Sequence, residues 1–60
     1  MTWVAVDKNR DEHVFDMKPI RSNFGTWKVA VYGKIQIPKG SIKKLIGREL
    51  NWGDEPVKLE

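Results

Sequence analysis

The stretch KVAVYGKIQIPKGSIKKLIGR, residues 28–48, decides the fold that we expect for this 60-residue chain. Its first part belongs to a run from Thr26 to Pro38 in which apolar and polar side chains alternate. Alternation with a period of two predicts an extended strand with one apolar face and one polar, basic face. Gly33 interrupts this run, and two interpretations are open: Tyr32-Gly33 forms a tight hairpin turn, or it forms a bulge in one bent strand.

The second part of the same stretch predicts a short helix near residues 41–47. Ser41 follows a strand-breaking Pro-Lys-Gly turn and is a favoured N-cap residue. Gly47 is placed to end the helix in the left-handed conformation. The apolar stripe of this helix consists of Ile42, Leu45 and Ile46.

The remaining patterns predict further strands. Residues 2–6 are rich in β-branched and aromatic side chains, and residues 13–17 alternate so that Phe15 and Met17 form a buried side. These two strands would form a hairpin with a loop of four to six residues. We expect an irregular loop over 20–25. Residues 49–52 could form a short strand, and residues 56–59 are expected to close an edge, where proline is tolerated.

The expected fold is therefore mainly β with one short helix (α+β), in a single small domain over residues 1–60. Two architectures with four or five strands fit the order: a small antiparallel sheet with the helix on one face, or a Src-homology-type barrel. Tryptophans supply much of the core in so short a chain. Trp3 and Trp27 are expected to be buried, whereas Trp52 could be a core residue or a contact residue.

Catalytic chemistry has few candidates in this sequence. His13 is the only histidine, cysteine is absent, and no serine stands in a nucleophile motif. The acidic residues around the first hairpin are expected to be structural or solubilising rather than catalytic; they are Asp7, Asp11, Glu12 and Asp16. We therefore expect no enzyme, no metal site and no cofactor.

Positive charge is concentrated in residues 28–48, which hold six of the eleven basic residues and no acidic one. The overall net charge of +3 permits binding to nucleic acid or to an acidic protein surface. Tyr32 would share a face with two lysines and could stack on bases. The candidate binding residues are Lys28, Tyr32, Lys34, Lys39, Gly40, Ser41, Lys43, Lys44 and Arg48.

The start of the predicted helix has two interpretations. Exposed N–H groups beside Lys39, Lys43 and Lys44 could hold a phosphate of a nucleic acid. Alternatively, this is an ordinary strand-to-helix turn, and its lysines keep the helix soluble. A second class of function is also open: a structural or assembly protein that self-associates or pairs with a partner through an exposed strand, either Val57 to Leu59 or Lys28 to Tyr32.

Two segments resemble a known group. Residues 37–52 and 54–57, with smaller support from residues 3–7 and from Lys18-Pro19, resemble short hypothetical proteins encoded in bacteriophage and prophage genomes. The resemblance implies a phage or mobile-element origin and an accessory role through binding of a host or phage macromolecule. No signal peptide or membrane span is visible, so we expect a cytoplasmic location and no membrane partner. Leu59-Glu60 is either native or a cloning scar.

Overall fold

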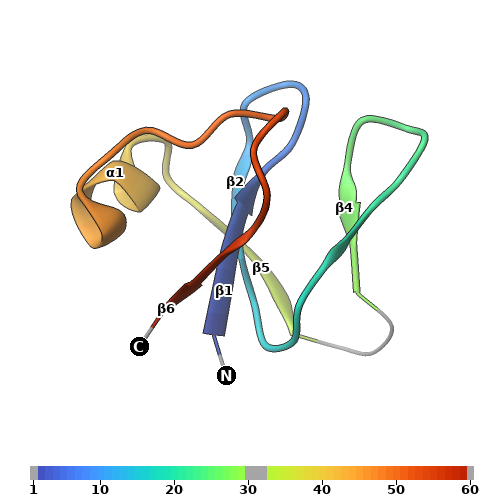
Figure 1. Ribbon diagram of the computed structural model, residues 1–60, viewed down its shortest axis with the longest axis horizontal. Coiled ribbons are helices and arrows are strands. Elements are labelled where there is room, and N and C mark those ends of the chain that lie inside the picture. Colours follow the sequence, from blue (N-terminus) through green and yellow to red (C-terminus); the bar gives the residue numbers. More distant parts are fainter. Residues whose placement is uncertain (1, 30–32, 60) are drawn as a thin grey trace.

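The computed structural model describes residues 2–29 and 33–59, which form six short strands and one helix (Figure 1). The first four strands lie in the N-terminal half, and the helix precedes the last strand. The elements are β1 (Thr2–Val6), β2 (Glu12–Phe15), β3 (Ile20–Arg21), β4 (Trp27–Lys28), β5 (Lys34–Ile37), α1 (Ser41–Ile46) and β6 (Val57–Leu59). The mainly β, α+β fold expected from the sequence is confirmed.

The strands form two sheets. The larger sheet has the order β5-β2-β1-β6, and all its pairs are antiparallel. The smaller sheet is the hairpin of β3 and β4, in which Ile20 lies opposite Lys28. Of the two predicted architectures, the structure has the small antiparallel sheet. The expected edge position of the last strand is also confirmed, since β6 stands at the end of the strand order and pairs with β1.

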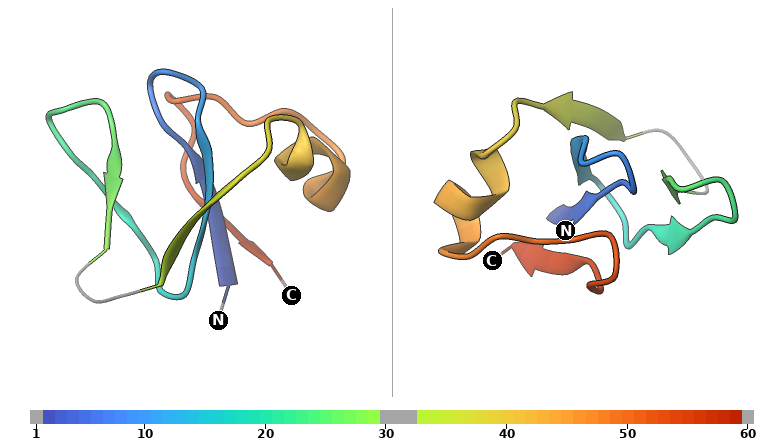
Figure 2. Two further views of the ribbon diagram at one scale, coloured as in Figure 1. Left: turned by 180° about the vertical axis from the view of Figure 1, so that it is seen from behind. Right: turned by 90° about the horizontal axis from the view of Figure 1, so that it is seen from above.

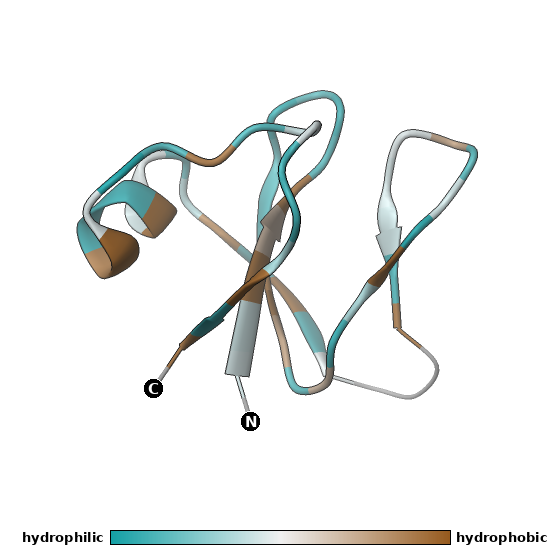
Figure 3. Ribbon diagram, in the orientation of Figure 1, coloured by the Kyte–Doolittle hydropathy of each residue, from teal (hydrophilic) through white to brown (hydrophobic). Residues whose placement is uncertain are grey.

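Both faces of the central strand β1 are covered, and its residues 3–6 are all apolar. Val4 and Val6 point to one face and pack with Ile42 of α1 and with Leu50. Ala5 points to the other face and packs with Phe15 and Trp27. Figures 1 and 2 show α1 on one side of the sheet and the β3–β4 hairpin on the other. Figure 3 shows the hydrophobic residues along β1 and the hydrophilic loop that follows it.

Of the two interpretations of the run over 26–38, the one with a single bent strand is wrong. The two ends of this run form β4 and β5, which belong to different sheets. Gly33 has a φ of 117°, in a region that side-chain-bearing residues rarely adopt, and a Cβ there would lie 2.6 Å from the Cβ of Asp16. The Gly33 carbonyl accepts a hydrogen bond from the Asp16 N–H at 3.0 Å. The open question about Tyr32-Gly33 includes Tyr32, which lies outside the described residues.

Several apolar residues expected in the core are exposed. Met17 is 52% exposed because β2 ends at Phe15, and Ile35 is 65% exposed on β5. Leu45 is 54% exposed, because a helix of this length turns only Ile42 and Ile46 towards the sheet. The irregular loop predicted over 20–25 begins with β3, and the possible strand over 49–52 is not formed.

The start of α1 is capped by a residue from another element. Ser41 was predicted to be the N-cap, but the cap position is Gly40 and no side chain of the cap residue contributes a hydrogen bond. Instead, the two carboxylate oxygens of Glu12 on β2 accept hydrogen bonds from the N–H groups of Gly40 and Ile42, each at 2.8 Å. The predicted left-handed end at Gly47 is confirmed, with a φ of 81°. In the described residues, no helix is long and apolar enough to cross a membrane.

This arrangement predicts which substitution destabilises the helix. Glu12→Ala should lower the free energy of unfolding by about 1–2 kcal/mol, because it leaves two helix N–H groups without their charged acceptor. Ser41→Ala should change it by less than about 0.5 kcal/mol, as surface substitutions usually do. Urea unfolding followed by tryptophan fluorescence measures both values. Equal losses in the two variants would contradict the assignment of Glu12 as the cap.

Candidate functional site

The turn between β3 and β4 presents an aromatic side chain to solvent. Phe24 is 82% exposed, the most exposed of the large hydrophobic residues described. The turn itself is ordered by hydrogen bonds: the Ser22 hydroxyl oxygen accepts from the N–H groups of Phe24 and Thr26 at 3.2 and 3.4 Å. The Ser22 N–H donates to the Thr26 carbonyl at 2.9 Å. Hydrogen bonds within the turn therefore fix the backbone that carries the exposed Phe24 ring.

Two lysines accompany Phe24. The Lys28 ammonium lies 5.3 Å from the centre of the Phe24 ring, within the range of a cation–π contact. The backbone N–H of Lys8, in the β1–β2 loop, donates to the Gly25 carbonyl at 2.8 Å, and this bond holds the loop against the turn. Both lysine side chains are exposed. We name Phe24, Lys28 and Lys8 the hairpin surface.

Buried contacts fix the hairpin to the large sheet. The Asp7 carboxylate accepts a hydrogen bond from the Trp27 N–H at 3.1 Å, and the Trp27 indole N–H donates to the Val6 carbonyl at 2.8 Å. Arg21 lies over the rings of Trp27 and Trp52, at 4.7 and 5.0 Å from their centres. Its guanidinium also donates to the Trp52 carbonyl at 2.7 Å. Trp27 is buried as expected, whereas Trp3 and Trp52 are partly buried against the same cluster.

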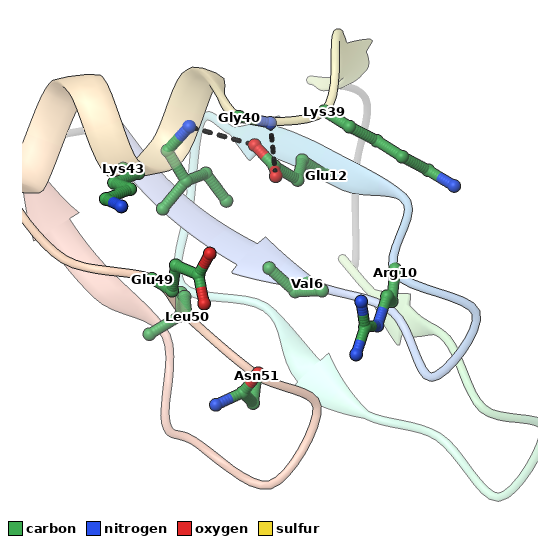
Figure 4. A pocket seen from close by; sticks show the side chains of 10 residues that line it. Val6, Arg10, Glu12, Lys39, Gly40, Lys43, Glu49, Leu50 and Asn51 are labelled. Carbon is green, nitrogen blue, oxygen red and sulfur yellow. Dashed lines mark hydrogen bonds between the residues drawn. The ribbon is translucent and has the colours of Figure 1, made fainter.

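A second feature is a pocket of about 220 Å³ beside the start of α1, shown in Figure 4. Its apolar floor consists of Val6, Ile42 and Leu50, all members of the core. Its charged rim consists of Arg10, Lys39, Lys43, Glu12 and Glu49. Since Glu12 is bound to the helix N–H groups, these groups are already satisfied by the protein itself. An incoming anion would therefore meet side-chain cations rather than the helix end.

The predicted binding residues do not form one surface. Lys28 lies on β4 and the helical lysines on α1, which are at opposite ends of the molecule in both Figures 1 and 2. Lys39, Gly40 and Lys43 line the pocket, and Ser41 follows them as the first residue of α1. Lys44 and Arg48 are exposed and do not line it. Tyr32 lies outside the described residues.

One predicted binding residue has a structural role. The Lys34 ammonium donates a hydrogen bond to the Trp27 carbonyl at 3.1 Å, and it lies 6.0 Å from the centre of the Phe15 ring. Lys34 on β5 is thus hydrogen-bonded to Trp27 on β4. Part of its charge is engaged within the protein.

Phe24, Lys8 and Arg10 are not among the binding residues predicted from the sequence. One signal could have found Phe24: the segment without acidic residues extends from Met17 to Arg48, so it includes the whole β3–β4 hairpin. An aromatic residue between turn formers in that segment has no alternation that would bury it. Lys8 and Arg10 carried no such signal, because their importance depends on contacts with residues far along the chain.

His13 is buried beside an acidic partner. Its Nδ1 atom lies 3.3 Å from a carboxylate oxygen of Asp7, and the residue is 8% exposed. Burial lowers the pKa of His13 below its ordinary value of 6.5; Asp7 and Asp11 act in the opposite direction, and Lys34 acts with the burial. Within residues 2–29 and 33–59, no group of three metal-ligating side chains comes together. No family model, curated protein or solved structure matches the chain.

The lowered pKa of His13 predicts a pH-dependent stability. In the unfolded chain the imidazole binds a proton near pH 6.5, whereas in the folded protein it resists protonation. The contribution is therefore fully present above pH 6.5 and is lost as the pH falls through the lower, folded pKa. Urea unfolding between roughly pH 7 and pH 5 should show stability that decreases towards acid. His13→Gln should flatten this part of the profile, and an unchanged profile in this variant would contradict the assignment.

Proposed function

We propose that this protein is a small, non-enzymatic binding protein that engages single-stranded nucleic acid through the hairpin surface. Phe24 stacks on a base, and Lys28 and Lys8 contact the neighbouring phosphates. The single observation that supports this proposal is the 82% exposure of Phe24 on a hydrogen-bonded turn, with a lysine ammonium 5.3 Å from its ring. Exposed aromatic rings between cations are the usual means of holding unpaired bases.

The exposure of Phe24 needs an explanation because the fold gains little from it. Burying a phenylalanine is worth about 1.5–3 kcal/mol, and in a chain of this size the core needs every such contribution. Stacking of one base on an aromatic ring is worth about 1–3 kcal/mol. The ring is thus placed where a base, rather than the protein, can cover it.

Charge favours nucleic acid over an acidic protein surface as the partner. The segment from Met17 to Arg48 has eight basic residues and no acidic one, so nothing in it repels a phosphate backbone. Lysines alone would serve an acidic protein equally well, but an exposed aromatic ring beside Lys28 adds the base-stacking element. A phage or mobile-element origin, an accessory role and a cytoplasmic location remain part of the proposal.

The first experiment measures the binding of a fluorescent oligothymidylate by anisotropy at low salt. Phe24→Ala should weaken binding by about 1–3 kcal/mol, or roughly 5- to 150-fold, because it removes the stacking ring. Ile35→Ala is the matched control, since it removes an exposed apolar side chain of β5. Equal affinity in the Phe24→Ala variant and the parent protein would contradict the proposal.

The salt dependence of the same binding tests the lysines. Replacing a lysine that contacts phosphate should reduce the slope of log affinity against log salt by about 0.7 for a single strand. We expect this change for Lys28→Gln and not for Lys44→Gln, which removes the same charge from α1. A salt-independent affinity for the oligothymidylate would contradict the proposed phosphate contacts.

A second candidate function is assembly through an exposed strand. Both β5 and β6 are edges of the large sheet, and β5 carries Ile35 at 65% exposure. Of the two strands predicted for this role, β6 is such an edge, whereas Lys28 to Tyr32 extends outside the described residues. If this function is correct, sedimentation should show a mass that rises with concentration, and Ile35→Lys should lower it. A constant monomer mass would exclude self-association through these edges.

A further inference from the structure

The pocket beside α1 collects three cations that have no ion-pair partner within the described part of the chain. Arg10, Lys39 and Lys43 all line it, and none has a carboxylate within ion-pair distance there. Figure 4 shows Arg10 and Lys43 on opposite sides of Val6, with Lys39 extending on the side of Arg10. Of the two carboxylates at the rim, Glu12 is engaged by the backbone of Gly40 and Ile42. With three cations against the two carboxylates of Glu12 and Glu49, the rim carries an excess of one positive charge, which favours an anion.

Arg10 has an unfavourable backbone conformation. Its φ is 74°, and it is the one described residue other than glycine with a positive φ. Its N–H donates to the Asp7 carbonyl at 2.9 Å, and the Asp7 N–H donates to the Asp11 carbonyl at 2.8 Å. These two bonds close a tight hairpin loop over residues 8–10. Arg10, the third residue of this loop, adopts the left-handed conformation at a position that usually holds glycine. Strained residues of this kind cluster at functional sites.

The size and lining of the pocket restrict its ligand. A volume of about 220 Å³ is below the roughly 300–1,000 Å³ of pockets that enclose drug-sized molecules, so a ligand of nucleotide size would fill the pocket and remain partly exposed to solvent. Arginine and lysine together favour a phosphate group, which arginine can hold with two parallel hydrogen bonds. The apolar floor of Val6, Ile42 and Leu50 suits a flat organic group attached to that phosphate. Glu49 and Asn51 at the rim can accept hydrogen bonds from it.

We propose that this pocket binds a phosphate monoester that carries a base-sized group, such as a nucleoside monophosphate, and that Arg10 contacts the phosphate. The site is separate from the hairpin surface and does not depend on Phe24. The phosphate can come from a free mononucleotide or from the phosphorylated end of a strand, and the two sources share this chemistry.

The test is an NMR titration of the whole protein with cytidine monophosphate, followed by cytidine and by inorganic phosphate. We expect the amide signals of residues 10–12 and 39–43 to shift with the monophosphate. Binding should be at least tenfold tighter than for either comparison compound, because only the monophosphate uses both the rim and the floor. Absence of shifts, or equal affinity for inorganic phosphate, would overturn the proposal.

Two variants of Arg10 separate binding from folding. Arg10→Asn removes the cation but tolerates the left-handed conformation, so it should keep the fold and weaken binding of the monophosphate at least tenfold. Arg10→Gly should move the midpoint of urea unfolding to a higher concentration while losing the same affinity, because glycine has no strain at this position. Unchanged binding in Arg10→Asn would overturn the role of Arg10.

The source of the phosphate is distinguished with an oligothymidylate, with and without a 5′-phosphate. A gain in affinity from the 5′-phosphate that Arg10→Asn removes would identify the strand end as the source, and its absence beside monophosphate binding would identify the free nucleotide. Phe24→Ala should leave monophosphate binding unchanged. Failure of the hairpin proposal therefore appears in the oligothymidylate arm, and failure of the pocket proposal appears in the monophosphate arm.

Discussion

The paired hydrogen bonds from the N–H groups of Gly40 and Ile42 to the Glu12 carboxylate are the contact on which the helical side of the protein depends. A helix of six residues does not persist in water without outside support. Glu12 holds its start to β2, and this places Ile42 in the core, where it is 1% exposed. The same contact forms one wall of the pocket and satisfies the helix end, so that charge recognition there is left to side chains.

The face of the sheet opposite α1 depends on Asp7, at the start of the loop that joins β1 to β2. Asp7 directly follows β1, and Glu12 is the first residue of β2. The Asp7 carboxylate accepts a hydrogen bond from the Trp27 N–H. Hydrogen bonds to these two carboxylates thus hold the elements that pack on the two faces of the sheet. Glu12 binds the start of α1, and Asp7 binds the β3–β4 hairpin. Between them lie Lys8, hydrogen-bonded to the hairpin turn, and Arg10 at the pocket. Five loop residues therefore connect both candidate binding features to one rigid sheet.

Local patterns in the sequence were sufficient for β1, for most of β2, for the helix and for its end at Gly47. Each depends on neighbours within a few residues. The alternation over 26–38 favoured a single strand, because a period of two indicates an extended backbone but not the sheet to which it belongs. It therefore could not show that β4 and β5 belong to different sheets. Ser41 looked like a cap because its competitor, Glu12, lies 28 residues before Gly40. The roles of Lys8 and Arg10 likewise arise only when distant segments meet.

We propose that the cations beside the exposed Phe24, and not the charge of the whole chain, recognise a nucleic acid strand. Amide NMR shifts of the whole protein during addition of a short oligothymidylate at low salt test it most directly. We expect the largest shifts at residues 22–28 and at Lys8, fading as salt rises, while the Gly40 and Ile42 signals retain their hydrogen-bonded positions. Shifts spread evenly over all lysines, with none at Phe24, would contradict it.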